Sequence, residues 1–235
     1  MGANTTYVAQ VGRPTDLSEF VDLYRAAEEA DEGRPRIDRD WIDTQFRDTG
    51  FDPDTDIVTV RDAEGTLVGA AMFDSRDPFV SSFCSKAVLP SVRDDGVGTM
   101  LMEFAIDRAQ TNLPKAPEGA RVTVSVGVHE VDERMRRLLD ERGFTVERYF
   151  HEMEIELDAD IDIPDDPDGV TFRTLGPDEP LDALVVTVRD SFRDHFGFVD
   201  QPLEMRLQRW GEFRKADSWD DDLVFLAEAD GEFVG

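Results

Sequence analysis

The chain is poor in the residue types that most often carry metal, redox or disulfide chemistry. It has one cysteine, Cys84, so no internal disulfide framework is possible and a reducing compartment is expected. Because Cys84 lies in an apolar stretch, it is more typical of a core residue than of a reactive thiol. The three histidines, His129, His151 and His195, are scattered, and none has a cysteine or another histidine at metal-ligand spacing. We therefore predict no metal site.

Long apolar runs are also missing. No window approaches the ~18 uninterrupted apolar residues of a membrane span. Residues 1–10 lack the charged segment followed by an apolar segment that marks a signal peptide. We therefore expect a cytoplasmic protein that does not span a membrane.

Positive charge is scarce as well. The chain carries 53 acidic and 25 basic residues, for a formal net charge of −28, and its lysines are Lys86, Lys115 and Lys215. Direct binding of nucleic acid is not expected, because phosphate contacts need a basic face. A surface this acidic repels itself in dilute buffer and is relieved by screening, which suggests a high-salt cytoplasm. An acidic protein from an ordinary organism is the alternative.

Hydrophobic periodicity predicts the element order β-α-α-β-β-β-α-β-α-β over residues 6–157. Apolar residues spaced three and four apart predict helices that begin near Asp16, around Trp41, after Gly98 and after Asp132. Alternation of apolar and polar residues predicts strands over residues 6–11, 57–60, 67–73, 79–89, 122–128 and 151–157.

The remaining residues repeat this beginning. Residues 158–169 are mostly Asp and Pro, a composition that cannot bury itself, so a linker is predicted there. Strands are predicted over residues 170–175 and 223–227, with helices from Asp178 and over residues 203–213 between them. The turn Ala229-Asp230-Gly231 then matches the earlier Ala63-Glu64-Gly65. We expect an in-register second copy of the first elements that stops inside its hairpin.

The stretch most informative about chemistry joins the strand over residues 79–89 to the following helix. It reads Val88-Leu89-Pro90-Ser91-Val92-Arg93-Asp94-Asp95-Gly96-Val97-Gly98-Thr99. The glycines allow backbone N–H groups to approach a phosphate closely, and the start of the helix adds unpaired donors and partial positive charge. A G-x-G pair alone is weak, because turns into helices also use glycine for steric reasons. With its context, we interpret the stretch as an anion-binding loop.

That context is V-x-P before the loop, Arg93 three residues ahead of Gly96, and the order of strands and helices. It resembles the pyrophosphate motif R/Q-x-x-G-x-G/A of the GNAT superfamily of N-acetyltransferases, and the resemblance covers residues 6–157. The resemblance implies an α/β (α+β) fold, with a mixed, mostly antiparallel sheet flanked by helices. It also implies that acetyl-CoA is the cosubstrate and that the strand over residues 122–128 diverges from the preceding strand to leave a slot for pantetheine.

Specific cofactor contacts follow from the same resemblance. Backbone groups near Lys86, Ala87 and Val88 would meet the acetyl carbonyl and the pantetheine arm. The pyrophosphate would be held by the loop that comprises Arg93, Asp94, Asp95, Gly96, Val97, Gly98 and Thr99.

The sequence departs from the family's pattern in ways that bear on catalysis. Family members often carry a tyrosine, as acid for the departing thiolate, where this chain has Leu139, and the strand over residues 79–89 has no Glu or Asp to act as base. Asp94 and Asp95 stand where the family tends to place basic residues. A like charge at 4 Å costs ~1 kcal/mol in water, so these carboxylates must point outward, be screened by salt or weaken CoA binding. The catalytic residues stay unassigned.

The second copy carries a resemblance of its own. Residues 189–198, followed by Trp210, resemble the opening of the second domain in tandem GNAT proteins of the mycothiol-synthase type. In those proteins, as the resemblance implies, the first domain is degenerate and the second acetylates. His195 follows Asp194 and could be a base, but a lone histidine is more often structural. We predict a complete GNAT domain over residues 1–157, an acidic linker over 158–169 and a partial second GNAT domain over 170–235.

Three functions agree with the sequence. The first is an acetyl-CoA-dependent N-acetyltransferase that acts on a primary amine of a small molecule or peptide. The second is a catalytically silent acyl-CoA-binding, regulatory or scaffold domain, which Leu139 and the missing base favour. The third is an interaction module without cofactor, favoured by Asp94 and Asp95. The expected partners are acetyl-CoA and a small amine, with a homodimer or a remainder beyond Gly235 as further alternatives.

Overall fold

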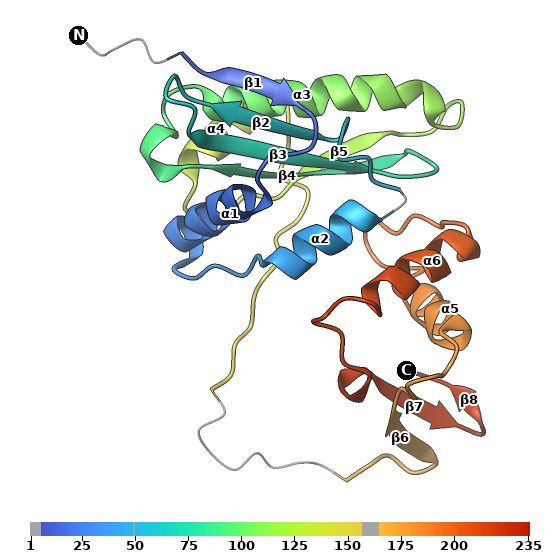
Figure 1. Cartoon of the computed structure of the whole chain (residues 1–235). Helices are drawn as coiled ribbons and strands as arrows, with labels where there is room; N and C mark the ends of the chain where they lie inside the picture. Colours follow the sequence, from blue (N-terminus) through green and yellow to red (C-terminus); the bar gives the residue numbers. More distant parts are fainter. Residues whose placement is uncertain (1–5, 49, 157–164) are drawn as a thin grey trace.

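A five-stranded mixed β-sheet organises the first part of the chain (Figure 1). The computed structural model describes residues 6–48, 50–156 and 165–235. Neighbouring strands follow the order of the sequence and are antiparallel, except that β5 runs parallel to β4. The strands are β1 (Val8–Val11), β2 (Ile57–Arg61), β3 (Leu67–Ser75), β4 (Ser81–Val88) and β5 (Thr123–Val126). The predicted mixed, mostly antiparallel sheet is confirmed.

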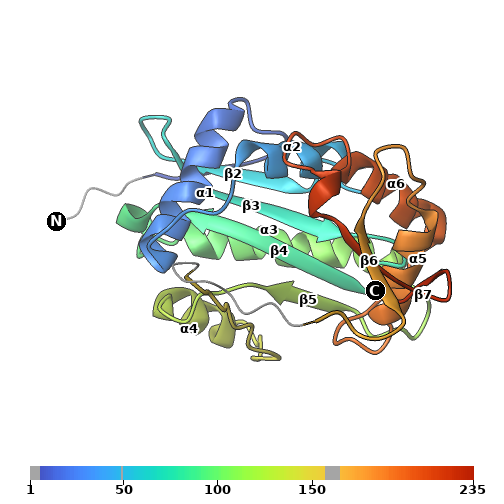
Figure 2. The same ribbon diagram turned by 90° about the horizontal axis from the view of Figure 1, so that it is seen from below.

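Helices cover both faces of this sheet (Figures 1 and 2). One face packs against α1 (Leu17–Glu32) and α2 (Arg39–Arg47), and the other against α3 (Val97–Asn112) and α4 (Glu133–Glu141). Successive side chains of a strand point to opposite faces, so along β3 Met72 joins the first layer and Phe73 the second. The short 3-10 helices η1 (Pro90–Val92) and η2 (Leu113–Lys115) flank α3.

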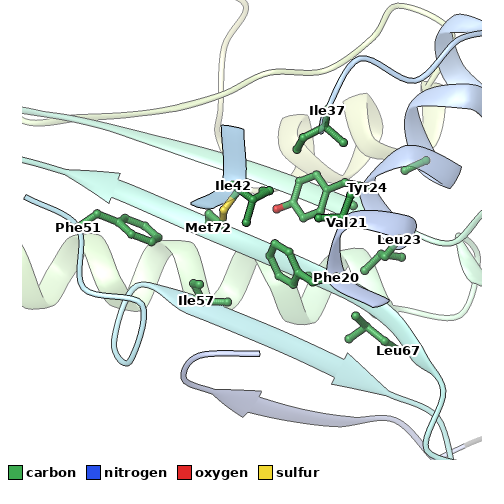
Figure 3. Packing of buried hydrophobic residues seen from close by; sticks show 13 residues of the cluster. Phe20, Val21, Leu23, Tyr24, Ile37, Ile42, Phe51, Ile57, Leu67 and Met72 are labelled. Atoms are coloured by element: carbon green, nitrogen blue, oxygen red, sulfur yellow. The ribbon is translucent and has the colours of Figure 1, made fainter. Parts of the chain in front are cut away.

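Figure 3 shows the core between α1, α2 and the sheet. Phe20 of α1 and Ile42 of α2 are fully buried, and the Phe20 ring centroid lies 5.1 Å from that of Tyr24. Burying one such side chain contributes roughly 1.5–3 kcal/mol. Asp16 caps α1 by accepting hydrogen bonds from the first turn, and Gly33 ends the helix at a φ of 74°. This cluster holds α1 against β4 and thereby fixes the C-terminal end of α1 beside the loop after β4.

On the other face, α3 approaches the sheet closely at Gly69. A Cβ atom at Gly69 would lie 2.4 Å from Val97 Cγ1, well inside any ordinary contact distance. Val97 is the first residue of α3 and is fully buried. Glycine at position 69 therefore allows the start of α3 to lie directly on β3, which places the preceding loop at the end of β4.

A second, smaller sheet follows in the chain. Its antiparallel strands pair in the order β6 (Val170–Thr174), β7 (Phe225–Ala229) and β8 (Glu232–Phe233). Between β6 and β7 come α5 (Asp182–Ser191), α6 (Leu203–Phe213) and the short η3 (Asp221–Leu223). This order of strand, two helices and two strands is the same as that from β1 to β3. The buried core is small and centres on Leu175, Leu184 and Leu226.

An ion cluster around the buried Asp48 and Arg76 joins the two parts of the chain. Asp48 Oδ2 lies 2.5 Å from Arg76 Nη1 and 3.3 Å from Arg209 Nε of α6. Arg76 Nε also lies 2.7 Å from Asp74 Oδ1. Burial opposes the charge of Arg76, but the hydrogen bonds that it donates to Asp74 and Asp48 raise its pKa on balance. Burial lowers the pKa of Arg209, and the neighbouring Arg76 lowers it further.

The strand predicted over residues 151–157 is wrong for its described part, residues 151–156, which form no strand. Leu157 and residues 158–164 of the predicted linker lie outside the described residues. Alternation of apolar and polar residues does not supply a partner backbone, and a strand without one is not stable. Met153 is accordingly 93% exposed.

Salt bridges, rather than strand pairing, hold residues 151–156 against the rest of the chain. Arg34 Nη2 lies 3.3 Å from Glu152 Oε1 and 2.9 Å from Glu154 Oε2, and Arg36 also binds Glu152. The segment therefore runs beside the loop between α1 and α2. Within the described residues, no helix is both long and apolar enough to cross a membrane.

Candidate functional site

The loop between β4 and α3 ends in a helix start that lacks a side-chain cap. Gly96 has a φ of 87°, in the left-handed region that favours glycine. The first helical hydrogen bond runs from the Met100 N–H to the Gly96 carbonyl, at 3.2 Å. The N–H groups of Val97, Gly98 and Thr99 therefore have no acceptor within the helix. Such a helix start favours an anion.

A cavity of about 230 Å³ opens beside this turn, between the end of β4 and α4. Most residues predicted to contact the cofactor line it: Lys86, Ala87, Val88, Arg93, Asp94, Gly96, Gly98 and Thr99. The other two lie elsewhere. Val97 is fully buried under the loop, and Asp95 accepts a hydrogen bond from the Tyr7 hydroxyl at 2.7 Å. We refer to this space as the loop cavity.

Arg93 does not extend freely into the loop cavity, because α1 holds its guanidinium. Arg93 Nη1 lies 2.5 Å from Asp31 Oδ1, Nη2 lies 3.0 Å from Asp31 Oδ2, and Nη2 also donates to the Ala27 carbonyl. The side chains of Arg93 and Asp31 are mostly buried. This pair ties the loop to the end of α1, a contact that the sequence did not predict.

Basic residues of α4 compensate for the acidic loop. Arg134 binds the carboxylate of Asp94, and both Arg134 and Arg137 line the loop cavity. Residues three apart on a helix share a face, and Met135 between them is buried in the core. These arginines were not predicted from the sequence, although the basic run from Arg134 to Arg137 around Met135 was the signal that could have revealed them.

Lys86 stands at the inner end of the loop cavity. It lies opposite Ala71 of β3, and its side chain is on the same face of β4 as Cys84 and Val88. Among the described residues it makes no hydrogen bond and no salt bridge. Burial lowers the pKa of Lys86, while the more distant Asp132 and Asp31 act in the opposite direction.

A larger cavity of about 1490 Å³ adjoins the loop cavity. α1, α2, β4, β5 and residues 144–152 line it, together with Phe196, Phe213 and Trp219 from the second part of the chain. Tyr24 also lines it, and its hydroxyl donates to the Ser85 carbonyl at 3.2 Å. Burial raises the pKa of Tyr24. We refer to this space as the acceptor cavity.

The pairing of β4 with β5 ends where the two cavities meet. The last paired residues are Cys84 and Val126, so β5 is shorter than the predicted strand over residues 122–128. From Ser85 to Val88, β4 has no strand on that side, which agrees with the expected divergence of the two strands. The backbone of this stretch can therefore receive a ligand.

The other candidate groups do not form a reactive centre. Cys84 is fully buried, and burial raises its pKa to about 12, as expected for a core residue. His195 Nδ1 lies 3.1 Å from the Phe196 carbonyl, and its ring packs on Phe192, so it contacts no carboxylate among the described residues. Leu139 is buried on α4 and lines the acceptor cavity. No group of three or more potential metal ligands occurs among the described residues.

A family model described as the acetyltransferase (GNAT) family matches residues 17–144. A GCN5-related N-acetyltransferase from Sphaerobacter thermophilus superposes with a TM-score of 0.71 at 24% identity, over 97% of this chain and 70% of that one. This likeness concerns the fold, and it extends over both parts of the chain.

Curated relatives are similar in sequence. The chain is 32% identical to a mycothiol acetyltransferase of Acidothermus cellulolyticus over 180 residues, which cover 76% of this chain and 50% of that protein. It is 27% identical to a mycothiol acetyltransferase of Salinispora tropica over 222 residues, which cover 94% of this chain and 66% of that protein. The chain therefore spans about half the length of the first of these relatives.

Proposed function

Because the chain belongs to the acetyltransferase (GNAT) family, we propose that residues 1–157 form a complete module that transfers an acetyl group from acetyl-CoA to a primary amine. The family uses acetyl-CoA as cosubstrate. The observation that carries the proposal is the uncapped start of α3, which faces a cavity walled by β4 and α4. This juxtaposition offers a phosphate site and an unpaired strand end to one ligand.

The loop cavity suits the pyrophosphate of CoA. The N–H groups of Gly98 and Thr99 supply hydrogen-bond donors, and Arg134 and Arg137 supply positive charge. A side chain at Gly98 would begin 3.1 Å from Met135 Cε and project toward α4. Glycine at this position therefore keeps the cavity open for the ligand.

The unpaired part of β4 suits the acetyl group. Between Ser85 and Val88 the strand has backbone groups that β5 does not engage. A backbone N–H directed at the thioester carbonyl polarises it and stabilises the charge that develops on its oxygen. The attacking amine would approach from the acceptor cavity, whose volume is more than sufficient for a small acceptor.

We further propose that residues 158–169 are a linker and that residues 170–235 are a partial second GNAT domain. The repeated order of strand, two helices and two strands supports this division. The described part of the second unit, residues 170–235, contains no counterpart of β4, the glycine loop or α3. A cytoplasmic location is part of the same proposal and is supported by the single, buried cysteine.

A catalytically silent acyl-CoA-binding domain is the second candidate. Two observations favour it, since α4 presents Leu139 to the acceptor cavity and β4 carries no carboxylate. A silent domain would bind acetyl-CoA through the same loop but would not release free CoA when an amine is added.

Turnover separates the two candidates. The full chain should be mixed with acetyl-CoA and a panel of primary amines in molar KCl, and free thiol should be measured over time. Amine-dependent release of CoA, reduced in a Gly98→Leu variant, is the result that the acetyltransferase proposal predicts. Binding of acetyl-CoA without release for any amine on the panel would favour the silent domain.

A further inference from the structure

The two cavities share a short boundary. The residues that line both of them are Ala27, Asp31 and Lys86. A ligand with its phosphates in the loop cavity and its acetyl group at the acceptor cavity must cross this boundary. Its thioester end therefore passes beside Lys86.

Lys86 is the available positive charge at this boundary. Asp31 is already engaged by Arg93, and Ala27 offers its carbonyl to the same guanidinium. The charged or titratable groups that act on Lys86 are Asp132 at the start of α4, Asp31 on α1, Arg93 on the loop and Cys84 on β4. None of them makes a hydrogen bond or salt bridge with it within the described chain.

We propose that the ammonium group of Lys86 stabilises and protonates the thiolate of CoA as it leaves the acetyl group. This inference rests on the proposed acetyltransferase function and names a further catalytic residue for it. The geometry that supports it is an unpaired cation on the part of β4 that β5 does not cover, at the junction of the two cavities.

The acceptor nitrogen attacks the thioester carbon, a C–N bond forms, and the C–S bond breaks with its electron pair left on sulfur. Lys86 transfers one proton from its Nζ atom to that sulfur and becomes a neutral amine. The proton that the acceptor nitrogen loses passes to solvent, and solvent returns one to Lys86. The products are the N-acetyl compound and CoA thiol.

Three groups near Lys86 are poorer donors. Leu139 is apolar, and Cys84 is fully buried with a pKa raised to about 12. The Tyr24 hydroxyl donates to the Ser85 carbonyl, and its ring packs in the core on the opposite face of the sheet. Burial moves the pKa of Lys86 downward, toward that of a thiol, which makes proton transfer to sulfur less uphill.

A competing role is that neutral Lys86 is itself acetylated. The charge of the cosubstrate argues against it, because phosphates bound in the loop cavity favour the protonated lysine. Asp132 and Asp31 act in the same direction. With cosubstrate bound, Lys86 is therefore a proton donor rather than a nucleophile.

Ionisation of enzyme-bound CoA tests the proposal without knowledge of the acceptor. The ultraviolet absorbance of the thiolate is followed as a function of pH for CoA bound to the full chain in molar KCl, with desulfo-CoA as blank. In the wild type we expect bound CoA to ionise about 1 pH unit or more below free CoA. In Lys86→Met this shift should vanish while CoA still binds, and in Lys86→Arg it should persist, because arginine keeps the charge.

Matched controls exist because the chain has so few lysines. Lys115→Met and Lys215→Met remove the same charge at positions that line neither cavity, so the shift should be unchanged. Lys86→Met should melt above the wild type at neutral pH, since it removes an unpaired and partly buried charge. This difference in melting temperature should narrow as pH rises from the lowered pKa of Lys86 toward ~10.4, the pKa of an exposed lysine. Over that range the folded wild type holds the neutral amine, so burial no longer opposes a charge.

The outcomes are distinct. An ionisation shift that Lys86→Met leaves intact would overturn the role of Lys86 and leave the proposed function standing. Mass spectrometry after incubation with acetyl-CoA should show no acetyl group on Lys86, and stoichiometric acetylation there would overturn the proton-donor role. No binding of CoA by the wild type would overturn the proposed function together with this inference.

Discussion

Val97 Cγ1 lies where a side chain on Gly69 would begin, since a Cβ atom at Gly69 would be 2.4 Å away. The contact between Gly69 and Val97 joins β3, the middle strand of the sheet, to the first residue of α3. It sets how closely the helix start approaches β4, and with it the shape of the loop cavity. The proposed phosphate site therefore depends on a residue that does not line it.

Replacement of Gly69 by alanine should destabilise the fold and weaken binding of acetyl-CoA. We expect a loss of about 1–3 kcal/mol in the free energy of unfolding, because an added methyl group overpacks the core. Gly211→Ala is the matched control, since Gly211 lies within α6 with open space beside it and alanine is favoured in helices. Val97→Ala should partly rescue Gly69→Ala, and strictly additive losses in the double variant would refute the contact.

Asp94 and Arg134 form an exposed pair at the mouth of the loop cavity, with side chains 69% and 56% accessible. Asp94→Asn should free Arg134 for the phosphates and remove a like charge, and we expect acetyl-CoA to bind up to roughly 5-fold more tightly at low salt. The gain should disappear in molar KCl because the interaction is then screened. Asp107→Asn, an exposed change further along α3, is the control. Weaker binding by Asp94→Asn in calorimetric titrations would mean that the pair orders the site.

Asp48 should be critical for stability, because it neutralises two arginines. Loss of one partner of a buried ion pair costs about 3–5 kcal/mol, and we expect the lower end of this range because Arg76 keeps Asp74 as a second partner. Asp48→Asn would leave Arg76 and Arg209 without their shared carboxylate. Denaturant unfolding should reveal a loss of this size. Asp54→Asn is the control, because it breaks an exposed 3.9 Å contact with Arg13 and should change stability by less than ~1 kcal/mol. Equal losses in the Asp48→Asn and Asp54→Asn variants would contradict the stabilising role of Asp48.

The net charge of −28 should make the fold salt-dependent. Self-repulsion over the acidic surface is screened as the Debye length falls to ~3 Å at 1 M salt. The melting temperature should therefore rise from dilute buffer to ~1 M KCl. A melting temperature that stays flat over this range would remove the case for a high-salt cytoplasm and leave the alternative of an ordinary acidic protein.

Local patterns were sufficient to predict much of the architecture. The helix over residues 203–213 and the hairpin of β2 and β3 occur where the periodicity predicts them. Their apolar side chains pack against neighbouring elements. The strand predicted over residues 151–157 had the required alternation. It failed over its described residues because pairing depends on a second strand, which a local pattern cannot provide.

The candidate site was predictable only in part. The glycine loop could be found because Gly96 and Gly98 leave a local signature. The ion pairs Arg93–Asp31 and Asp94–Arg134 join residues far apart in the sequence, so no local pattern could predict them. The isolation of Lys86 is a property of its three-dimensional surroundings, so only its backbone was predicted as a cofactor contact.

Calorimetric titration of the full chain with acetyl-CoA in molar KCl tests the central claim most directly. We predict one site per chain, abolished by Gly98→Leu, which fills the loop cavity, and retained in Gly211→Leu, where the added side chain meets open space. Both variants should first be shown to unfold cooperatively like the wild type. Binding that survives Gly98→Leu, or a second site per chain, would contradict the assignment of acetyl-CoA to the loop between β4 and α3.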